Sequence, residues 1–175
     1  MTIDNRQIIG LGDVNAGFKV YIGNWADMPE YQNITGIHPI DGEQIRAIGQ
    51  CCGNGWRKVF NVYAKLLFEW YSSQSTAVLF DDWQSLRNKQ LLQEQSNSAL
   101  VYGLPSITEA DDSIHIICGR THAKPLIDTL NFIWLDTDFA IYQPLKIIIS
   151  PYFDYRQLSN VKIQTLVRLI HHCQT

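Results

Sequence analysis

The stretch IIISPYFDYRQLSN, residues 147–160, decides the fold. Three isoleucines in a row are typical of a strand that is buried on both faces, as the strands of parallel sheets are. Ser150-Pro151 ends this run, because proline has no N–H to donate to a strand ladder. The loop that follows carries aromatic and polar side chains, and Ser159 can cap the next helix. The stretch thus predicts a core strand, a polar loop at its carboxyl end and a helix.

The same alternation of strand and helix extends over the rest of the chain. Short runs rich in Val, Ile and Tyr, bounded by turn residues, predict strands at 18–23, 76–80, 99–102, 114–118 and 145–149. Apolar spacing and capping residues predict helices at 42–52, from Asp81 or Asp82 to about 95, from Thr121 to about 130, and after Ser159.

The clearest helical pattern covers residues 56–70. Its apolar side chains fall on one face at helical spacing, and they are Trp56, Val59, Phe60, Tyr63, Leu66, Leu67 and Trp70. Strands that alternate with helices predict a three-layer α/β fold with a mainly parallel sheet of four or five strands. We expect the whole chain, residues 1–175, to form one such domain.

The composition limits the class of protein. The chain has 175 residues, of which 46% are hydrophobic and 11% aromatic, and this is enough apolar area to fill one core. It lacks the pattern of a signal peptide and any apolar run of the ~20 residues needed to span a bilayer. Its four cysteines show no CxxC spacing. We therefore expect a cytoplasmic protein without membrane contact, bound metal or cofactor.

The formal net charge of −3 argues against a protein that binds duplex DNA through a strongly basic surface. The charge is unevenly distributed, because residues 113–175 carry six basic and four acidic side chains. An anion-binding face is therefore expected to involve the last third of the chain.

Polar or small residues follow three of the predicted strands, at Gly23-Asn24, Gly119-Arg120 and Ser150-Pro151. In parallel sheets the ligand crevice lies outside the carboxyl ends of the strands. We therefore expect these three turns to gather at one edge and to form a cleft.

The segment VYIGNWADMPEYQN, residues 20–33, places an amide, a carboxylate and aromatic rings directly after the first predicted strand. Asn24 and Asp27 can orient or activate a water molecule, and Trp25 or Tyr31 can stack on a planar ligand. The alternative is that Asn24 and Asp27 make only side-chain-to-backbone bonds within a turn.

Two further segments carry basic side chains beside a glycine turn. In CGRTHAKP, residues 118–125, Arg120 stands at a helix start whose free N–H groups can bind an anion. In CCGNGWRK, residues 51–58, Arg57 stands at a helix start, where the dipole disfavours cations, and this suggests contact with an anionic ligand. The alternative for both segments is an ordinary turn with solvated charges.

Taken in chain order, these segments resemble the uracil-DNA glycosylase superfamily. The polar loop at 20–29 resembles its water-activating loop, IHIICGRTHAKPLI resembles its Gly-x-x-Ala strand-to-helix segment, and SPYFDYRQLSN resembles its His-Pro-Ser-Pro loop and helix start. The match departs in two places. In the catalytic loop, Asn24 holds the early position and the carboxylate, Asp27, comes later. In the last loop, the histidine of the superfamily is replaced, and Tyr152 stands nearest to its place. The resemblance implies a divergent, bacterial-type member of that superfamily.

Two functions are compatible with this resemblance. The first is hydrolysis of the N-glycosidic bond of a nucleobase in DNA or in a nucleoside-like ligand. Asn24 or Asp27 would then position water, Trp25 or Tyr31 would stack on the base, and Tyr152 would bond near the leaving base. The further substrate-binding residues would be Ser150 in the last loop and two arginines, Arg57 and Arg120.

The second is a non-catalytic protein that keeps the crevice for a small anionic or planar ligand. A third interpretation assigns all these loops to packing. The first two predict that Tyr152 faces the loop of Asn24 and Asp27 across a pocket that holds one planar ring.

Overall fold

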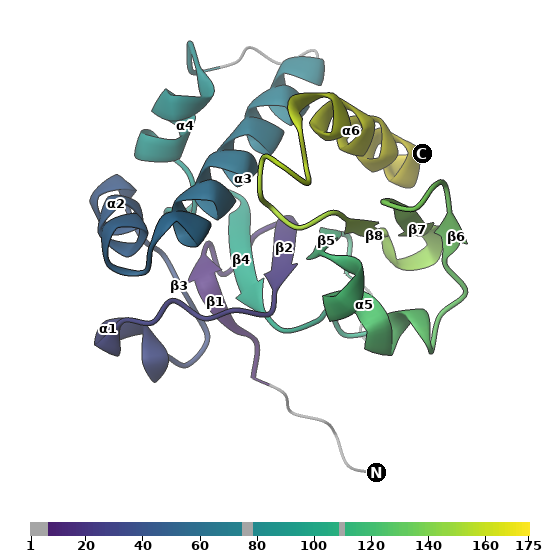
Figure 1. The fold of residues 1–175 in the computed structure, drawn as a ribbon, viewed down its shortest axis with the longest axis horizontal. Helices are drawn as coiled ribbons and strands as arrows, with labels where there is room; N and C mark the ends of the chain where they lie inside the picture. The colour runs from purple at the N-terminus through teal and green to yellow at the C-terminus, as the bar shows by residue number, and fades with distance from the viewer. Residues whose placement is uncertain (1–6, 75–78, 109–110) are drawn as a thin grey trace.

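The strand that contains the Ile147 run lies inside an eight-stranded sheet (Figure 1). The computed structural model describes residues 7–74, 79–108 and 111–175. In sheet order the strands are β3 (Ile37–His38), β1 (Ile9–Gly12), β4 (Ser98–Tyr102), β2 (Phe18–Ile22), β5 (Ile114–Cys118), β8 (Ile147–Ser150), β7 (Ala140–Tyr142) and β6 (Ile133–Trp134).

The four central strands, β4, β2, β5 and β8, run parallel to one another. On either side of them, β1 pairs with β4 and β7 pairs with β8 in the antiparallel sense. The predicted α/β class and the mainly parallel sheet are therefore confirmed. The predicted count of four or five strands is wrong, because short outer strands extend the sheet on both sides.

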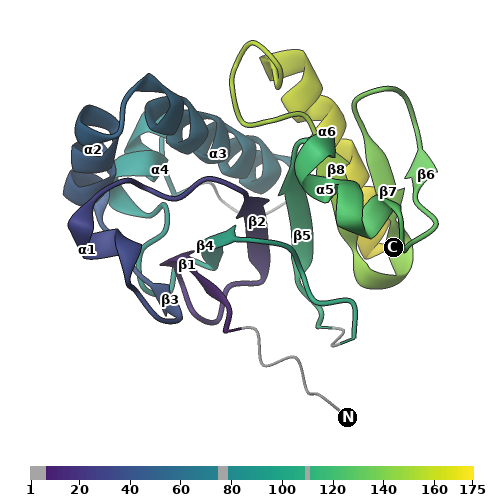
Figure 2. The ribbon, with the colours of Figure 1, turned by 60° about the horizontal axis from the view of Figure 1, so that its bottom comes forward.

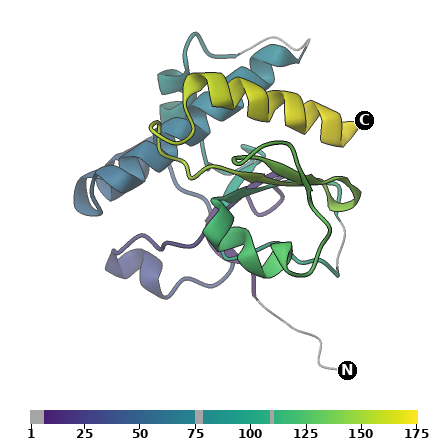
Figure 3. The same cartoon turned by 45° about the vertical axis from the view of Figure 1, so that its right-hand side comes forward.

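Helices cover both faces of the sheet. The core of one face contains side chains of α2 (Gly42–Cys51), α3 (Asn54–Ser73), α4 (Trp83–Lys89) and α6 (Asn160–Gln174). The other face packs against α5 (Arg120–Ile127), and Figure 3 shows the sheet between α5 and the pair α3 and α6. Neighbouring residues on the central strands alternate between the two cores, as the two-residue period of a strand requires.

The apolar stripe predicted at 56–70 is confirmed, because all seven of its side chains are buried along α3. Tyr63 is the largest of the fully buried side chains. Its hydroxyl lies 2.9 Å from the carbonyl oxygen of Ala99 and 3.2 Å from that of Phe18. The hydroxyl therefore donates to the backbone of the central strands, which removes the cost of burying it.

The three isoleucines of β8 are fully buried, as the opening stretch predicts. The strand is not the innermost one, because it lies between the parallel strand β5 and the antiparallel strand β7. Its ladder ends before Pro151. Between β7 and β8 the chain forms a single 3-10 turn, Gln143–Leu145.

Most predicted helices begin where a capping residue stands. Ser159 caps α6, and Asp82 caps α4 by accepting the Ser85 N–H at 2.7 Å. The expectation that the helix after Asp82 continues to about 95 is wrong: α4 ends at Lys89, and Leu92 adopts positive φ soon afterwards. The prediction that Thr121 caps a helix is also wrong, because Gly119, with φ of 93°, is the N-cap of α5.

The predicted strand at 76–80 lies mainly outside the described residues. Its two described residues, Leu79 and Phe80, are not in a strand, and Leu79 is 83% exposed. A short helix, α1 (Pro29–Gln32), follows the loop after β2.

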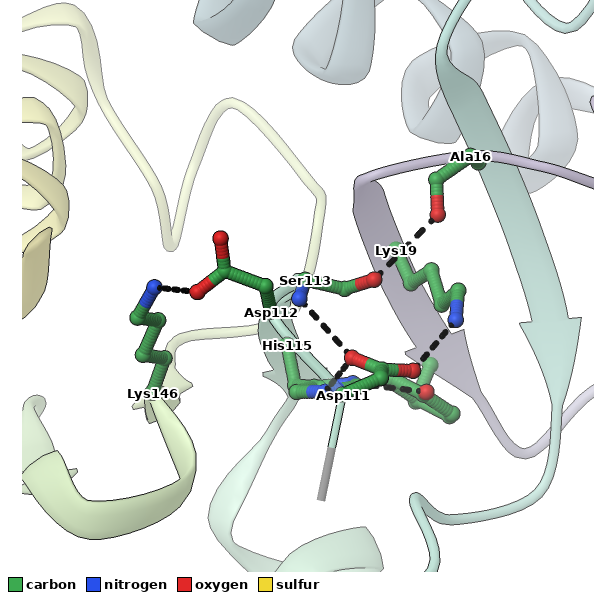
Figure 4. Close-up of polar contacts among 8 residues, drawn as sticks. Ala16, Lys19, Asp111, Asp112, Ser113, His115 and Lys146 are labelled. Atoms are coloured by element: carbon green, nitrogen blue, oxygen red, sulfur yellow. Dashed lines mark hydrogen bonds and ion pairs between the residues drawn. The ribbon is translucent and has the colours of Figure 1, made fainter. Parts of the chain in front are cut away.

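A polar network joins β2 and β5 to the loop before β5 (Figure 4). The Tyr21 hydroxyl donates to His115 Nδ1 at 2.8 Å, and His115 Nε2 donates to Asp111 Oδ1 at 3.0 Å. Lys19 pairs with the other Asp111 oxygen at 2.8 Å. Burial lowers the pKa of His115 more than the nearby Asp111 raises it. The imidazole is therefore neutral at pH 7, and the network fastens the loop to the sheet.

Replacing Asp111 with asparagine is expected to make the stability of the protein less sensitive to acid. Burial raises the pKa of Asp111, but hydrogen bonds from Lys19 and Ser113 bring it well below its ordinary value, as does the charge that His115 acquires at acid pH. A depressed carboxyl pKa gives stability that is present above the unfolded pKa of about 3.9 and is lost as the pH falls toward the folded pKa. The expected loss is about 1 kcal/mol at pH 7, because the Asp111 side chain is 45% exposed.

Urea denaturation at pH 7 and near pH 3 measures this effect. The difference in the free energy of unfolding between the wild type and Asp111→Asn should be smaller at the lower pH. Asp112→Asn is the control, because Asp112 is almost fully exposed and pairs only with Lys146 among the charged residues described. A difference that is equal at both pH values would show that the Asp111 carboxylate is not the titrating group.

Candidate functional site

The carboxyl ends of the four parallel strands meet at one edge of the sheet. After β2, the next parallel strand along the chain is β4, which lies on one side of β2. After β5, the next parallel strand is β8, which lies on the opposite side of the sheet. Figure 2 shows the segment after β2 running toward α1, whereas the segment after β5 turns into α5. Such a switch point between neighbouring strands is where ligands bind in open α/β sheets. The candidate site is therefore the edge between β2 and β5.

Asn24, after β2, and Tyr152, after β8, meet at this edge. Asn24 Nδ2 donates a hydrogen bond of 3.2 Å to the Tyr152 hydroxyl oxygen. Burial raises the pKa of Tyr152, and the bond from Asn24 offsets only part of this effect. The phenol is thus neutral and keeps its own proton to donate. The predicted approach of Tyr152 to the loop after β2 is found. The predicted pocket between them is not, because a bond of 3.2 Å leaves no room for a planar ring between the two side chains.

Trp25 extends the same cluster toward β4. Its ring stacks on Tyr102 with a centroid distance of 4.4 Å and an interplanar angle of 24°, and 42% of Trp25 remains exposed. The Tyr102 hydroxyl is buried and has no hydrogen-bond partner among the described residues. Burial raises the pKa of Tyr102 to about 12, against the opposing effect of the nearby Ala26 backbone N–H. The hydroxyl is thus covered from solvent, with the Ala26 backbone near it.

His122 completes the edge from the side of α5, and the sequence-based site did not include it. Its Nε2 lies 2.6 Å from the carbonyl oxygen of Gly103, after β4, so this nitrogen donates. Its Nδ1 faces Gly23, where a Cβ atom would stand 3.2 Å from it. His122 therefore fastens α5 to the segment after β4 and packs beside Gly23 after β2. Its place in a strand-to-helix turn was the only sequence signal for it.

Asp27 lies on the exposed loop between β2 and α1. Its Oδ1 accepts a hydrogen bond of 2.8 Å from Gln32 Nε2. The carboxylate is thus held in place near the end of α1 by a neutral donor. Within the described part of the chain, no hydrogen bond joins this carboxylate to Asn24 or Tyr152.

Two predicted substrate-binding residues are buried. Tyr31 belongs to the core beneath α2 and α3, and its ring is not available to stack on a ligand. Ser150 is fully buried, and its hydroxyl donates to the Pro151 carbonyl oxygen at 2.9 Å. The structure therefore does not place either side chain at the exposed edge where the sequence-based site expects it.

Two predicted arginines lie apart from the Asn24–Tyr152 pair. The Arg120 guanidinium stacks on Trp134 of β6, with 4.3 Å between its central carbon and the ring centroid. Arg57 lines a cavity between α2, α3 and α4. Arg46 and Arg87 line the same cavity, and none of the residues that line it belongs to the last third of the chain.

Among residues 7–74, 79–108 and 111–175, no group of three or more His, Cys, Asp or Glu side chains is arranged to hold a metal ion. Within the same residues no helix has both the length and the apolar character needed to cross a membrane.

A family model matches residues 9–171 of the chain, and its description is a family of unknown function, DUF6942. Because the match covers most of the chain, the protein belongs to this family. The chain has no match among curated proteins or among solved structures. The function must therefore be argued from the site itself.

Proposed function

We propose that this DUF6942 protein binds a planar, nucleobase-like ring at the edge between β2 and β5. The observation that carries the proposal is the meeting of Asn24 and Tyr152, which are 128 residues apart in the chain. We further propose that the fold is a divergent form of the uracil-DNA glycosylase type. The parallel centre of the sheet and the polar loops after β2 and β8 support this proposal.

The two side chains offer a matched pair of hydrogen-bonding groups. Tyr152 keeps a proton to donate, and the Asn24 amide has a carbonyl oxygen that accepts. No hydrogen bond to this oxygen is found among the described residues. A ring edge with a carbonyl beside an N–H, as in uracil or thymine, complements this pair.

An exposed aromatic ring nearby suits the same ligand. Trp25 is half-exposed and already lies parallel to the Tyr102 ring, so its free face can stack on a planar ring. The Tyr102 ring, which is 8% exposed, packs on the other face of Trp25. Such stacking contributes about 1–3 kcal/mol per base in proteins that bind single strands.

Binding without hydrolysis is the function that the geometry favours. Hydrolysis requires a group that activates water, and Asp27 is the one carboxylate in the loop between β2 and α1. Its Oδ1 accepts from Gln32, and among the described residues no hydrogen bond links it to the Asn24–Tyr152 pair. Glycosidic hydrolysis would therefore require this loop to rearrange when the ligand binds.

A binding experiment tests the proposal. Wild-type protein is titrated with uracil, thymine, cytosine and adenine by NMR, and with a uracil-containing single-stranded oligonucleotide. Tyr152→Phe removes the donor and should weaken binding of uracil by about 5–10-fold, the effect of one hydrogen bond. It should leave the free energy of unfolding within about 1 kcal/mol of the wild type.

Tyr155→Phe is the matched control, because Tyr155 lies in the same loop and is exposed. The proposal fails if no base binds at millimolar concentration, or if Tyr152→Phe binds as the wild type does. The release of free uracil from the oligonucleotide, lost in Asp27→Asn, would replace simple binding with hydrolysis.

A further inference from the structure

We propose that the cavity between α2, α3 and α4 binds the phosphate groups of an anionic ligand through Arg46, Arg57 and Arg87. This site is separate from the edge between β2 and β5 and does not depend on the ring-binding proposal. The proposal rests on one observation: three arginines and no carboxylate line this cavity, although the net charge of the chain is negative.

The cavity has a volume of about 250 Å³. All three arginines line it, together with the amide side chains of Gln50, Asn61 and Asn88 and with apolar and glycine residues of α2 and α3. No acidic side chain lines it. None of the three arginines forms an ion pair with any residue that the structure describes. The site therefore holds excess positive charge.

Neutral partners hold the Arg87 guanidinium in the cavity wall. Its Nη1 donates to Asn61 Oδ1 at 2.5 Å, and its Nε donates to Asn88 Oδ1 at 3.1 Å. Burial lowers the pKa of Arg87, and the charge of Arg46 lowers it further. Arg87 is therefore not a freely solvated surface charge, because it is half-buried, held by two amide side chains and close to the positive charge of Arg46. A bound anion would relieve the repulsion.

Close packing of α2 against α4 keeps the cavity in shape. A Cβ atom on Gly42, the first residue of α2, would lie only 2.3 Å from the carbonyl oxygen of Asn88. This contact requires glycine and brings Arg46 and Arg87 to the same space from two different helices. Guanidinium groups present paired N–H donors that match the oxygens of phosphate.

A second cavity, of about 270 Å³, continues along α3 and shares Arg57 and Asn61 with the first. Lys58, Lys65 and Tyr155 line it, and Lys58 is already paired with Asp154 at 2.9 Å. Two adjoining cavities with a shared arginine suit a ligand that carries two phosphates in sequence. The phosphates can belong to a diphosphate-containing small molecule or to the backbone of a single-stranded nucleic acid.

Calorimetric titration with pyrophosphate, and in parallel with an oligothymidylate, tests the site at about 50 mM salt. Arg46→Gln and Arg87→Gln should each weaken pyrophosphate binding by about 10-fold or more, because each removes a charge-assisted hydrogen-bonding group. Arg168→Gln on α6 is the matched control and should change binding by less than about 2-fold. Arg46→Gln keeps the test valid if Arg87→Gln unfolds the protein.

The proposal is overturned if pyrophosphate does not bind the wild type at millimolar concentration, or if Arg168→Gln weakens it as much as Arg46→Gln does. An oligothymidylate that binds at least 10-fold more tightly than pyrophosphate, with log K falling linearly with log salt, identifies nucleic acid as the source of the phosphates. The reverse order identifies a small phosphorylated ligand. Tyr152→Phe should leave pyrophosphate binding unchanged, so the two sites can fail independently.

Discussion

Replacing Leu66 with alanine is expected to lower the free energy of unfolding by about 2–5 kcal/mol. Leu66 is fully buried in the middle of α3, within the core that this helix shares with the sheet and with α6. The substitution removes three buried carbon atoms and leaves a cavity that the surrounding side chains fill only in part. Since domains of this size have a net stability of about 5–15 kcal/mol, the loss would be a large fraction of the total.

Urea denaturation, monitored by circular dichroism, measures this loss as a shift in the urea concentration at the midpoint of unfolding, with the m value unchanged. Val161→Ala on α6 is the matched control, because Val161 also loses methyl groups but is 73% exposed. The control should lie within about 0.5 kcal/mol of the wild type. A comparably small change in Leu66→Ala would mean that the stripe on α3 is not the core of the protein.

The sequence predicts the central strands and α3 because their signals are strong and local. Seven apolar side chains at helical spacing identify the buried face of α3, and all seven are buried. The outer strands carry no such signal. Strands β3 and β6 contain two residues each, which is too short for any period to appear, and they exist only because a neighbouring strand offers an edge.

Only the part of the candidate site that follows from the parallel direction of the strands could be predicted from the sequence. Parallel strands end at a common edge, and for this reason Asn24 and Tyr152 meet across the sheet. The direction of a side chain at a strand end depends on register, which sequence does not show. Ser150 and Tyr31 consequently point inward. The arginine cavity depends on how α2 and α4 pack together, and no local pattern shows that packing.

Replacing Gly12 with alanine is expected to cost about 2–6 kcal/mol, as strain and overpacking add together. Gly12 ends β1 with φ of +123°, a conformation that residues with a side chain rarely adopt. A Cβ atom there would lie 2.4 Å from the carbonyl oxygen of Ser98 and 2.7 Å from Ala99 Cα. The same Ser98 oxygen accepts the Asp13 N–H at 2.9 Å. Alanine would therefore push β1 away from β4 and break this bond.

Thermal and urea unfolding of Gly12→Ala and Gly55→Ala, measured side by side, test this account of β1. Gly55 is the second residue of α3, is exposed and has no atom within 4 Å of the position of a Cβ atom. The same substitution there should stabilise the protein by about 0.5 kcal/mol, because alanine loses less backbone entropy on folding. The two variants should thus shift in opposite directions. If both are stabilised, or if they are equal, β1 does not approach β4 closely enough to require glycine.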